Sequence, residues 1–175
     1  IASNIFAGIG FAAILLSLMS QLQVQGLTHL SSLKGLLWGL AGFSAFFVAP
    51  GIGLPPEIPG IEAQPVENRQ LWWLFAVISV ALGLLVISFA PLNFKGIGII
   101  GLGLPYLVKV PHHEGPAFVH PDAYAVETLT RLHQEFIIAS GISNLAFWLM
   151  IGTCSAWILN AWVLKDLTNR EAVNA

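Results

Sequence analysis

Residues able to bind a metal ion are concentrated in one polar segment of the chain, Val110–Glu135. Four of the five histidines lie in this segment, with acidic residues among them. Imidazole nitrogen and carboxylate oxygen are ligands that divalent ions such as cobalt, nickel and zinc accept. His112, His113 and Glu114 place three donors in a row on an expected turn, and His120 follows. The segment therefore predicts either an entry site for a divalent cation or a solvated loop that is merely rich in histidine.

A second candidate is Glu57, the acid in the turn LPPEIPG at 54–60. Prolines on both sides of this residue fix the backbone angle φ and prevent a helix from continuing through the turn. A carboxylate held rigidly at the edge of a membrane suits a metal ligand or a gate, whereas a plain surface acid is the alternative. Arg69 is expected either to pair with Glu57 or Glu67 or to lie alone at the interface.

The composition indicates what must position these residues. The chain has 175 residues, of which 56% are hydrophobic and only 9% are charged, whereas a soluble domain carries about 25% charged residues. The polar residues are gathered between long apolar runs, so we predict an all-α, polytopic integral membrane bundle surrounded by lipid. The formal net charge of −2 gives no basic surface for nucleic acid.

We expect about five transmembrane helices in a single transmembrane domain, 1–175. The expected spans are 5–22, 35–49, 71–89, 96–110 and 136–164, with polar loops at 50–70 and 110–135. The segment 96–110 is short for a bilayer core of about 20 residues. We expect a short spanning helix there, and a re-entrant segment is the alternative.

Small residues and tryptophans predict how these helices pack and where they end. Small residues at helical spacing let helices approach closely in lipid, and tryptophans beside an arginine at the start of an apolar run are typical of an interfacial anchor. The expected packing positions are Gly10, Gly35, Gly39 and Gly42, and the expected anchors are Arg69, Trp72 and Trp73.

The charged residues outside the spans favour one orientation. Lys34, Lys95, Lys165 and Arg170 fall on one side of five spans, against three basic residues on the other side. Because cytoplasmic loops carry an excess of lysine and arginine, we expect a multi-pass protein with a cytoplasmic C-terminus.

No enzymatic constellation is present in the sequence. It contains no P-loop, nucleophile elbow, dinucleotide fingerprint or HExxH motif. We therefore expect no enzyme and no tightly bound cofactor, and a divalent metal ion such as cobalt is the one ligand that the donor residues suggest.

Three stretches resemble a known family. NIFAGIGFAAILL at 4–16, the run GLLWGLAGFSAFFVA at 35–49, and GLPPEIPG at 53–60 followed by RQLWW at 69–73 are similar to the predicted cobalt transporter subunit family CbtA. Family members usually carry a further helix and a His-rich loop upstream, so the resemblance implies a chain that starts just after that loop. The segment HHEGPAFVH at 112–120 departs from the family pattern, which usually has a Pro/Asn-rich linker there.

The resemblance implies a subunit of a divalent-cation uptake system, with cobalt as the cargo, in the bacterial inner membrane. It also implies other membrane subunits, among them a small single-helix, His-bearing CbtB-like protein. The alternative is a non-catalytic structural subunit of a larger membrane complex. It is favoured by the absence of charged and histidine residues from 35–49, 71–89 and 136–164, because an ion pathway normally needs polar groups at depth.

Overall fold

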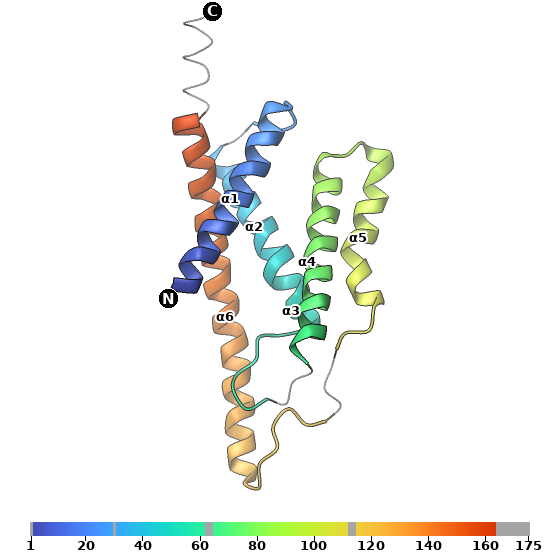
Figure 1. Ribbon diagram of the computed structural model, residues 1–175, viewed down its shortest axis with the longest axis vertical. Coiled ribbons are helices and arrows are strands. Elements are labelled where there is room, and N and C mark those ends of the chain that lie inside the picture. Colours follow the sequence, from blue (N-terminus) through green and yellow to red (C-terminus); the bar gives the residue numbers. More distant parts are fainter. Residues whose placement is uncertain (1, 30, 62–64, 112–114, 164–175) are drawn as a thin grey trace, which may run out of the picture. The chain divides into compact units, whose positions relative to one another are not determined.

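All of the regular secondary structure is helical in the part that the computed structural model describes, residues 2–29, 31–61, 65–111 and 115–163. Figure 1 shows the helices joined by turns and loops. In chain order they are α1 (Ala2–Val24), α2 (Ser32–Phe43), the π turn η1 (Ser44–Val48), α3 (Ala49–Gly53), α4 (Val66–Phe89), the 3-10 turn η2 (Leu92–Phe94), α5 (Lys95–Leu107), α6 (Ala123–Ile158) and the π turn η3 (Leu159–Val163).

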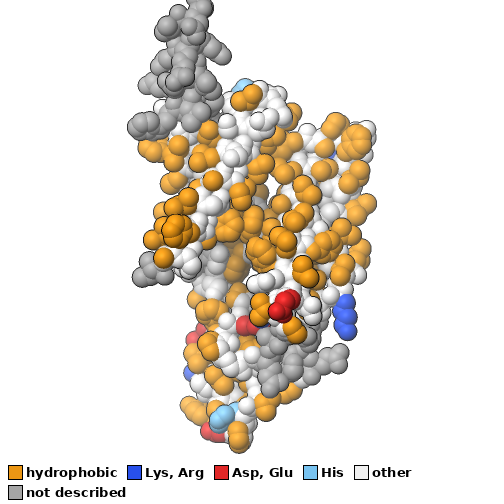
Figure 2. All heavy atoms as spheres, in the orientation of Figure 1, with side chains coloured by type: hydrophobic (Ala, Val, Ile, Leu, Met, Phe, Trp, Pro, Cys, Tyr) orange, Lys and Arg blue, Asp and Glu red, His pale blue; other side chains and the backbone are white. Residues whose placement is uncertain are grey.

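Four of the helical stretches are long and apolar enough to cross a membrane, which confirms the predicted polytopic helical fold. They are Ala2–Val24, Leu33–Gly53, Val66–Phe89 and Ala123–Ala161. The remaining expected span, 96–110, corresponds to the shorter apolar helical stretch Leu92–Leu107. On the face shown in Figure 2, hydrophobic side chains cover the helices and charged side chains are sparse. Lipid is the solvent that such a surface requires.

The chain divides into two compact units, and the first comprises Ile1–Phe43 and Leu145–Ala175. In this unit α2 packs against the C-terminal part of α6 through glycine. A Cβ atom added at Gly39 would lie 2.5 Å from the carbonyl oxygen of Trp148, and one added at Gly35 would lie 2.9 Å from that of Gly152. From α1, the ring of Phe11 lies 4.9 Å, centroid to centroid, from that of Trp148. The backbones of α2 and α6 therefore approach too closely for residues 35 and 39 to carry a side chain.

The second unit is Ser44–Asn144 and has its own glycine contact. A Cβ atom at Gly83 of α4 would lie 2.8 Å from the carbonyl oxygen of Gly98 in α5. Beside this contact, Ala45, Ala49 and Val80 form a buried apolar cluster. Small side chains at these positions bring the π turn, α3, α4 and α5 of this unit together.

Helix enters the loop expected at 50–70 from both ends, and it enters the loop expected at 110–135 from the C-terminal end. A helix continues through Pro50, in its first turn, to Gly53, since proline is tolerated at the start of a helix. Helix α4 begins at Val66 rather than Leu71, with Pro65 at its N-cap position. Helix α6 is continuous from Ala123, so the C-terminal part of the expected loop 110–135 and the last span are one element.

Candidate functional site: the Glu57 turn and its pocket

A proline-rich turn follows α3 and carries Glu57. Helix α3 stops after Gly53, and the N–H of Leu54 donates a 2.7 Å hydrogen bond to the carbonyl of Pro50. The turn ends at Gly60, whose φ of +97° is a conformation that residues with a side chain rarely adopt. Prolines and this glycine together fix the path of the backbone, and with it the direction of the Glu57 side chain.

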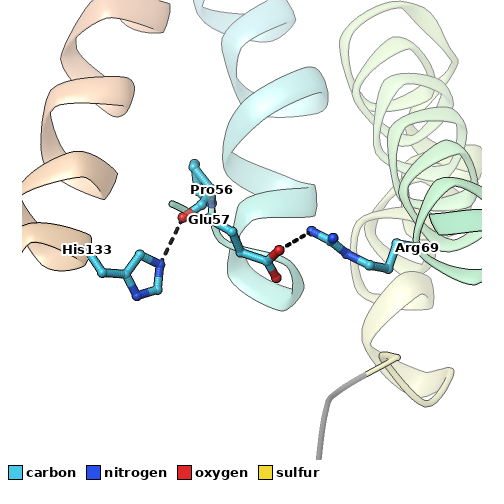
Figure 3. Close-up of polar contacts among 4 residues, drawn as sticks. All are labelled: Pro56, Glu57, Arg69 and His133. Atoms are coloured by element: carbon cyan, nitrogen blue, oxygen red, sulfur yellow. Dashed lines mark hydrogen bonds and ion pairs between the residues drawn. The ribbon is translucent and has the colours of Figure 1, made fainter. Parts of the chain in front are cut away.

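Arg69, in the first turns of α4, is the ionic partner of Glu57. Its Nη2 lies 2.8 Å from Oε2 of Glu57, and Figure 3 shows the two side chains reaching toward each other. The exposed fractions of the side chains are 27% for Arg69 and 25% for Glu57. Solvent therefore reaches the pair and screens it, and such pairs stabilise a fold by about 1 kcal/mol or less.

His133 of α6 holds the other side of the turn. Its Nε2 lies 2.9 Å from the carbonyl oxygen of Pro56, as Figure 3 also shows. Because a carbonyl can only accept, this nitrogen carries the proton and donates. The imidazole also meets the ring of the buried Phe118 edge-on, with 6.1 Å between centroids. The Glu57 turn is thus tied to α4 by an ion pair and to α6 by a hydrogen bond.

An open pocket of about 410 Å³ lies beside the ion pair. One part of its wall is apolar and aromatic, and the other part carries the charged pair and an amide. Its lining residues are Phe46, Phe47, Pro50, Gly51, Leu54, Pro55, Pro56, Glu57, Val66, Arg69, Gln70 and Trp73. All of them belong to the second unit. The size falls within the range of about 300–1,000 Å³ for small-molecule sites.

Two buried donors near this pocket lack an acceptor among the described residues. They are Nε of Arg69 and Nε1 of Trp72. Trp72 is buried with its indole ring against Gly53, where a Cβ atom would collide with the ring. Trp73 is 37% exposed, and its ring lies 6.2 Å from that of Phe46. Buried polar groups normally have partners, and these two donors are exceptions among the described residues.

Of the predicted metal ligands, the structure describes Glu57 and His120. His112, His113 and Glu114 lie outside the described residues. His120 is exposed, and its Nδ1 accepts a 3.1 Å hydrogen bond from the backbone N–H of Asp122. In the part of the chain that the structure describes, no group of three or more His, Cys, Asp or Glu side chains is placed to hold a metal ion.

The glycines expected to pack helices occupy different surroundings. Gly35 and Gly39 contact the backbone of α6, and a Cβ atom at Gly42 would run into the indole ring of Trp148. Gly10 of α1 has open space around it, with nothing within 4 Å.

Sequence reasoning missed the aromatic wall of the pocket and the bond between His133 and Pro56. Phe46 and Phe47 read as ordinary residues of an apolar span, and no short-range spacing relates His133 to a turn 77 residues earlier. The proline-rich turn itself was the available signal, because so stiff a segment needs neighbours to hold it.

Four membrane-length helices and a charged turn beside an amphipathic pocket define a multi-pass helical membrane protein. A family model described as CbtA, probable cobalt transporter subunit, matches residues 1–160. The chain therefore belongs to the CbtA family and is a membrane subunit of a probable cobalt uptake system. Being a subunit, it works with other membrane components. No match was found among curated proteins, and none was found among solved structures.

Proposed function

We propose that this subunit receives its cargo, a divalent cobalt ion, at the Glu57 turn. The observation that carries the proposal is the Glu57 carboxylate, which is partly exposed beside an open pocket and is held by a turn tied to both α4 and α6. A carboxylate oxygen suits a hard or borderline divalent ion. The proposal includes a transport role without catalysis, in the bacterial inner membrane and with a cytoplasmic C-terminus.

Arg69 acts in this proposal as the resting counter-ion of Glu57. The pair is 2.8 Å long and more than a quarter of the Arg69 side chain is exposed. Because a solvent-screened ion pair is weak, a divalent cation can displace the guanidinium from the carboxylate at small cost. Glu57 would then release the ion onward as Arg69 returns.

Other ligands must come from elsewhere, because one carboxylate does not hold a divalent ion selectively. The described residues bring no cluster of three donors together. We propose that other membrane subunits, among them a small His-bearing CbtB-like protein, supply ligands. His112, His113, Glu114 and His120 stay a prediction for the entry site.

The test is uptake of labelled cobalt by cells that express Glu57→Gln. We expect an initial rate lower by about tenfold, the effect of losing one charge-assisted contact, at an unchanged level of protein in the membrane. Glu67→Gln is the matched control, since Glu67 lies in the first turn of α4 and does not line the pocket. Wild-type uptake by Glu57→Gln at equal expression would exclude the transport role of this carboxylate.

The second candidate function is that of a structural subunit without its own ion contact, and the absence of a donor cluster in the described residues favours it. Mild-detergent purification with mass measurement, combined with reconstitution into liposomes, distinguishes these two candidate functions. If the complex with its partners moves cobalt equally well with wild-type and Glu57→Gln chains, the structural role holds. If the chain alone moves cobalt in liposomes, neither the partner requirement nor the structural role survives.

The proposed orientation has its own test. A reporter that is active only outside the cytoplasm, fused after Ala175, should be silent, because four basic residues lie on the side that carries the C-terminus. Activity of the reporter would place the C-terminus outside.

A further inference from the structure

We infer that the pocket beside the Glu57–Arg69 pair binds the headgroup of a phospholipid that carries a primary ammonium, an ethanolamine phospholipid. This inference does not depend on cobalt transport. It follows from the pairing of one carboxylate and one guanidinium at the edge of a pocket whose remaining wall is apolar.

The pocket-lining residues Arg69 and Gln70 lie where the chain is expected to pass through the headgroup region of a bilayer. Arg69 and Gln70 directly precede the apolar run that starts at Leu71 and continues through α4. Phe46 and Trp73 lie on the apolar part of the wall, with their rings 6.2 Å apart. Aromatic side chains are enriched where headgroups meet acyl chains. The occupant is therefore expected to be polar at one end and apolar at the other, as a lipid is.

Arg69 offers the phosphate contact. Its Nη2 contacts Glu57, and 27% of the side chain is exposed beside the pocket that it lines. A phosphodiester oxygen is the strong acceptor that a guanidinium edge commonly binds. A phosphate that meets the guanidinium from the pocket would leave the ion pair with Glu57 in place.

Glu57 offers the ammonium contact and decides which lipid fits. Arg69 contacts Oε2 of its carboxylate, so an incoming cation binds through Oε1. The charges of Glu57 and Arg69 sum to zero, which complements a zwitterion made of one phosphate and one ammonium. A glycerol phospholipid carries the same phosphate but no ammonium, so Glu57 would have no cation to bind. A choline headgroup carries the positive charge but has no N–H to donate to the carboxylate.

The experiment uses the full chain purified without metal, in the presence of a chelator, so that cobalt does not compete for Glu57. The protein is placed in nanodiscs that contain equal amounts of ethanolamine and glycerol phospholipids with identical acyl chains. Native mass spectrometry after partial delipidation measures the ratio of the two lipids that remain bound. We expect a ratio of about five in favour of ethanolamine, the effect of one charge-assisted contact at a partly exposed site.

Variants and headgroups provide two independent readouts. Glu57→Gln should bring the ratio close to one, whereas Arg69→Gln should lower the retention of both lipids and keep the preference for ethanolamine. The exposed controls Glu67→Gln and Arg131→Gln should keep the wild-type ratio. With the wild-type chain, stepwise N-methylation of ethanolamine to choline should lower retention at each step. A variant that unfolds loses both lipids alike, and the methylation series needs no variant.

A wild-type ratio of one, equal retention of choline and ethanolamine lipids, or the same change in Glu67→Gln as in Glu57→Gln would overturn the inference. A polypeptide that copurifies on the pocket without enrichment of ethanolamine lipid would also overturn it. Because cobalt is absent throughout, failure here leaves the cobalt uptake measurement untouched, and failure of cobalt uptake leaves the lipid ratio untouched.

Discussion

The close approach of α2 and α6 makes Gly39→Ala the sharpest test of the packing in the first unit. The added Cβ atom would lie 2.5 Å from the carbonyl oxygen of Trp148 and 3.0 Å from Cα of Leu149. Both neighbours are backbone atoms, so relief requires the helices to move apart. Overpacking costs about 1–3 kcal/mol, and a contact this short with backbone atoms falls in the upper part of that range, about 2–3 kcal/mol.

Helix propensity acts in the opposite direction and must be subtracted. Alanine is favoured over glycine inside a helix by about 1 kcal/mol, so the net loss for Gly39→Ala is about 1–2 kcal/mol. For a chain of this size, that loss lowers the melting temperature by roughly 2–8 °C. Gly10→Ala is the matched control, because nothing lies within 4 Å of the added atom. Its melting temperature should stay the same or rise.

The assay is thermal unfolding of the two purified variants and the wild type in the same detergent, followed by intrinsic fluorescence. Opposite signs for the two substitutions would support the glycine-mediated contact. If Gly39→Ala melts at or above the wild-type temperature, the helices do not approach as the structure shows, and the reasoning fails.

Two further predictions concern the second unit. Gly83→Ala should lower the melting temperature, since its Cβ atom would lie 2.8 Å from the carbonyl oxygen of Gly98, whereas Gly103→Ala meets nothing within 4 Å and should not; equal effects would contradict this. Tyr106→Phe removes the 2.9 Å hydrogen bond that the phenol donates to the carbonyl of Ala49. It should cost about 1 kcal/mol in unfolding free energy, and an unchanged unfolding midpoint in a denaturant titration would show that this bond does not contribute.

Much of the fold could be predicted because lipid imposes simple rules on a sequence. Long apolar runs need to form helices in a bilayer, and four of them do. Helix ends were harder, because Val66–Gln70 is polar yet helical, and hydropathy does not separate a polar first turn from a loop.

Contacts between distant segments could not be predicted. A stripe of glycines predicts that another helix packs closely, but it does not identify the partner. Nothing in the run 35–42 indicates that Trp148 lies there. The same holds for Glu57, since Arg69 could pair with either Glu57 or Glu67 by sequence, and the geometry selects Glu57. Which side chains meet depends on helix rotation, and rotation is set by packing that a single sequence does not display.

The π turn η1 has a consequence for the pocket of the second unit. Its Phe46 and Phe47 are consecutive residues, and both line the pocket. A π turn holds more residues than the 3.6 of a regular α-helical turn, so consecutive side chains lie closer together around the helix axis than the usual angle of about 100°. The wider turn therefore lets one helix present two adjacent aromatic rings to the same pocket, and a regular helical turn at this place would spread them further apart.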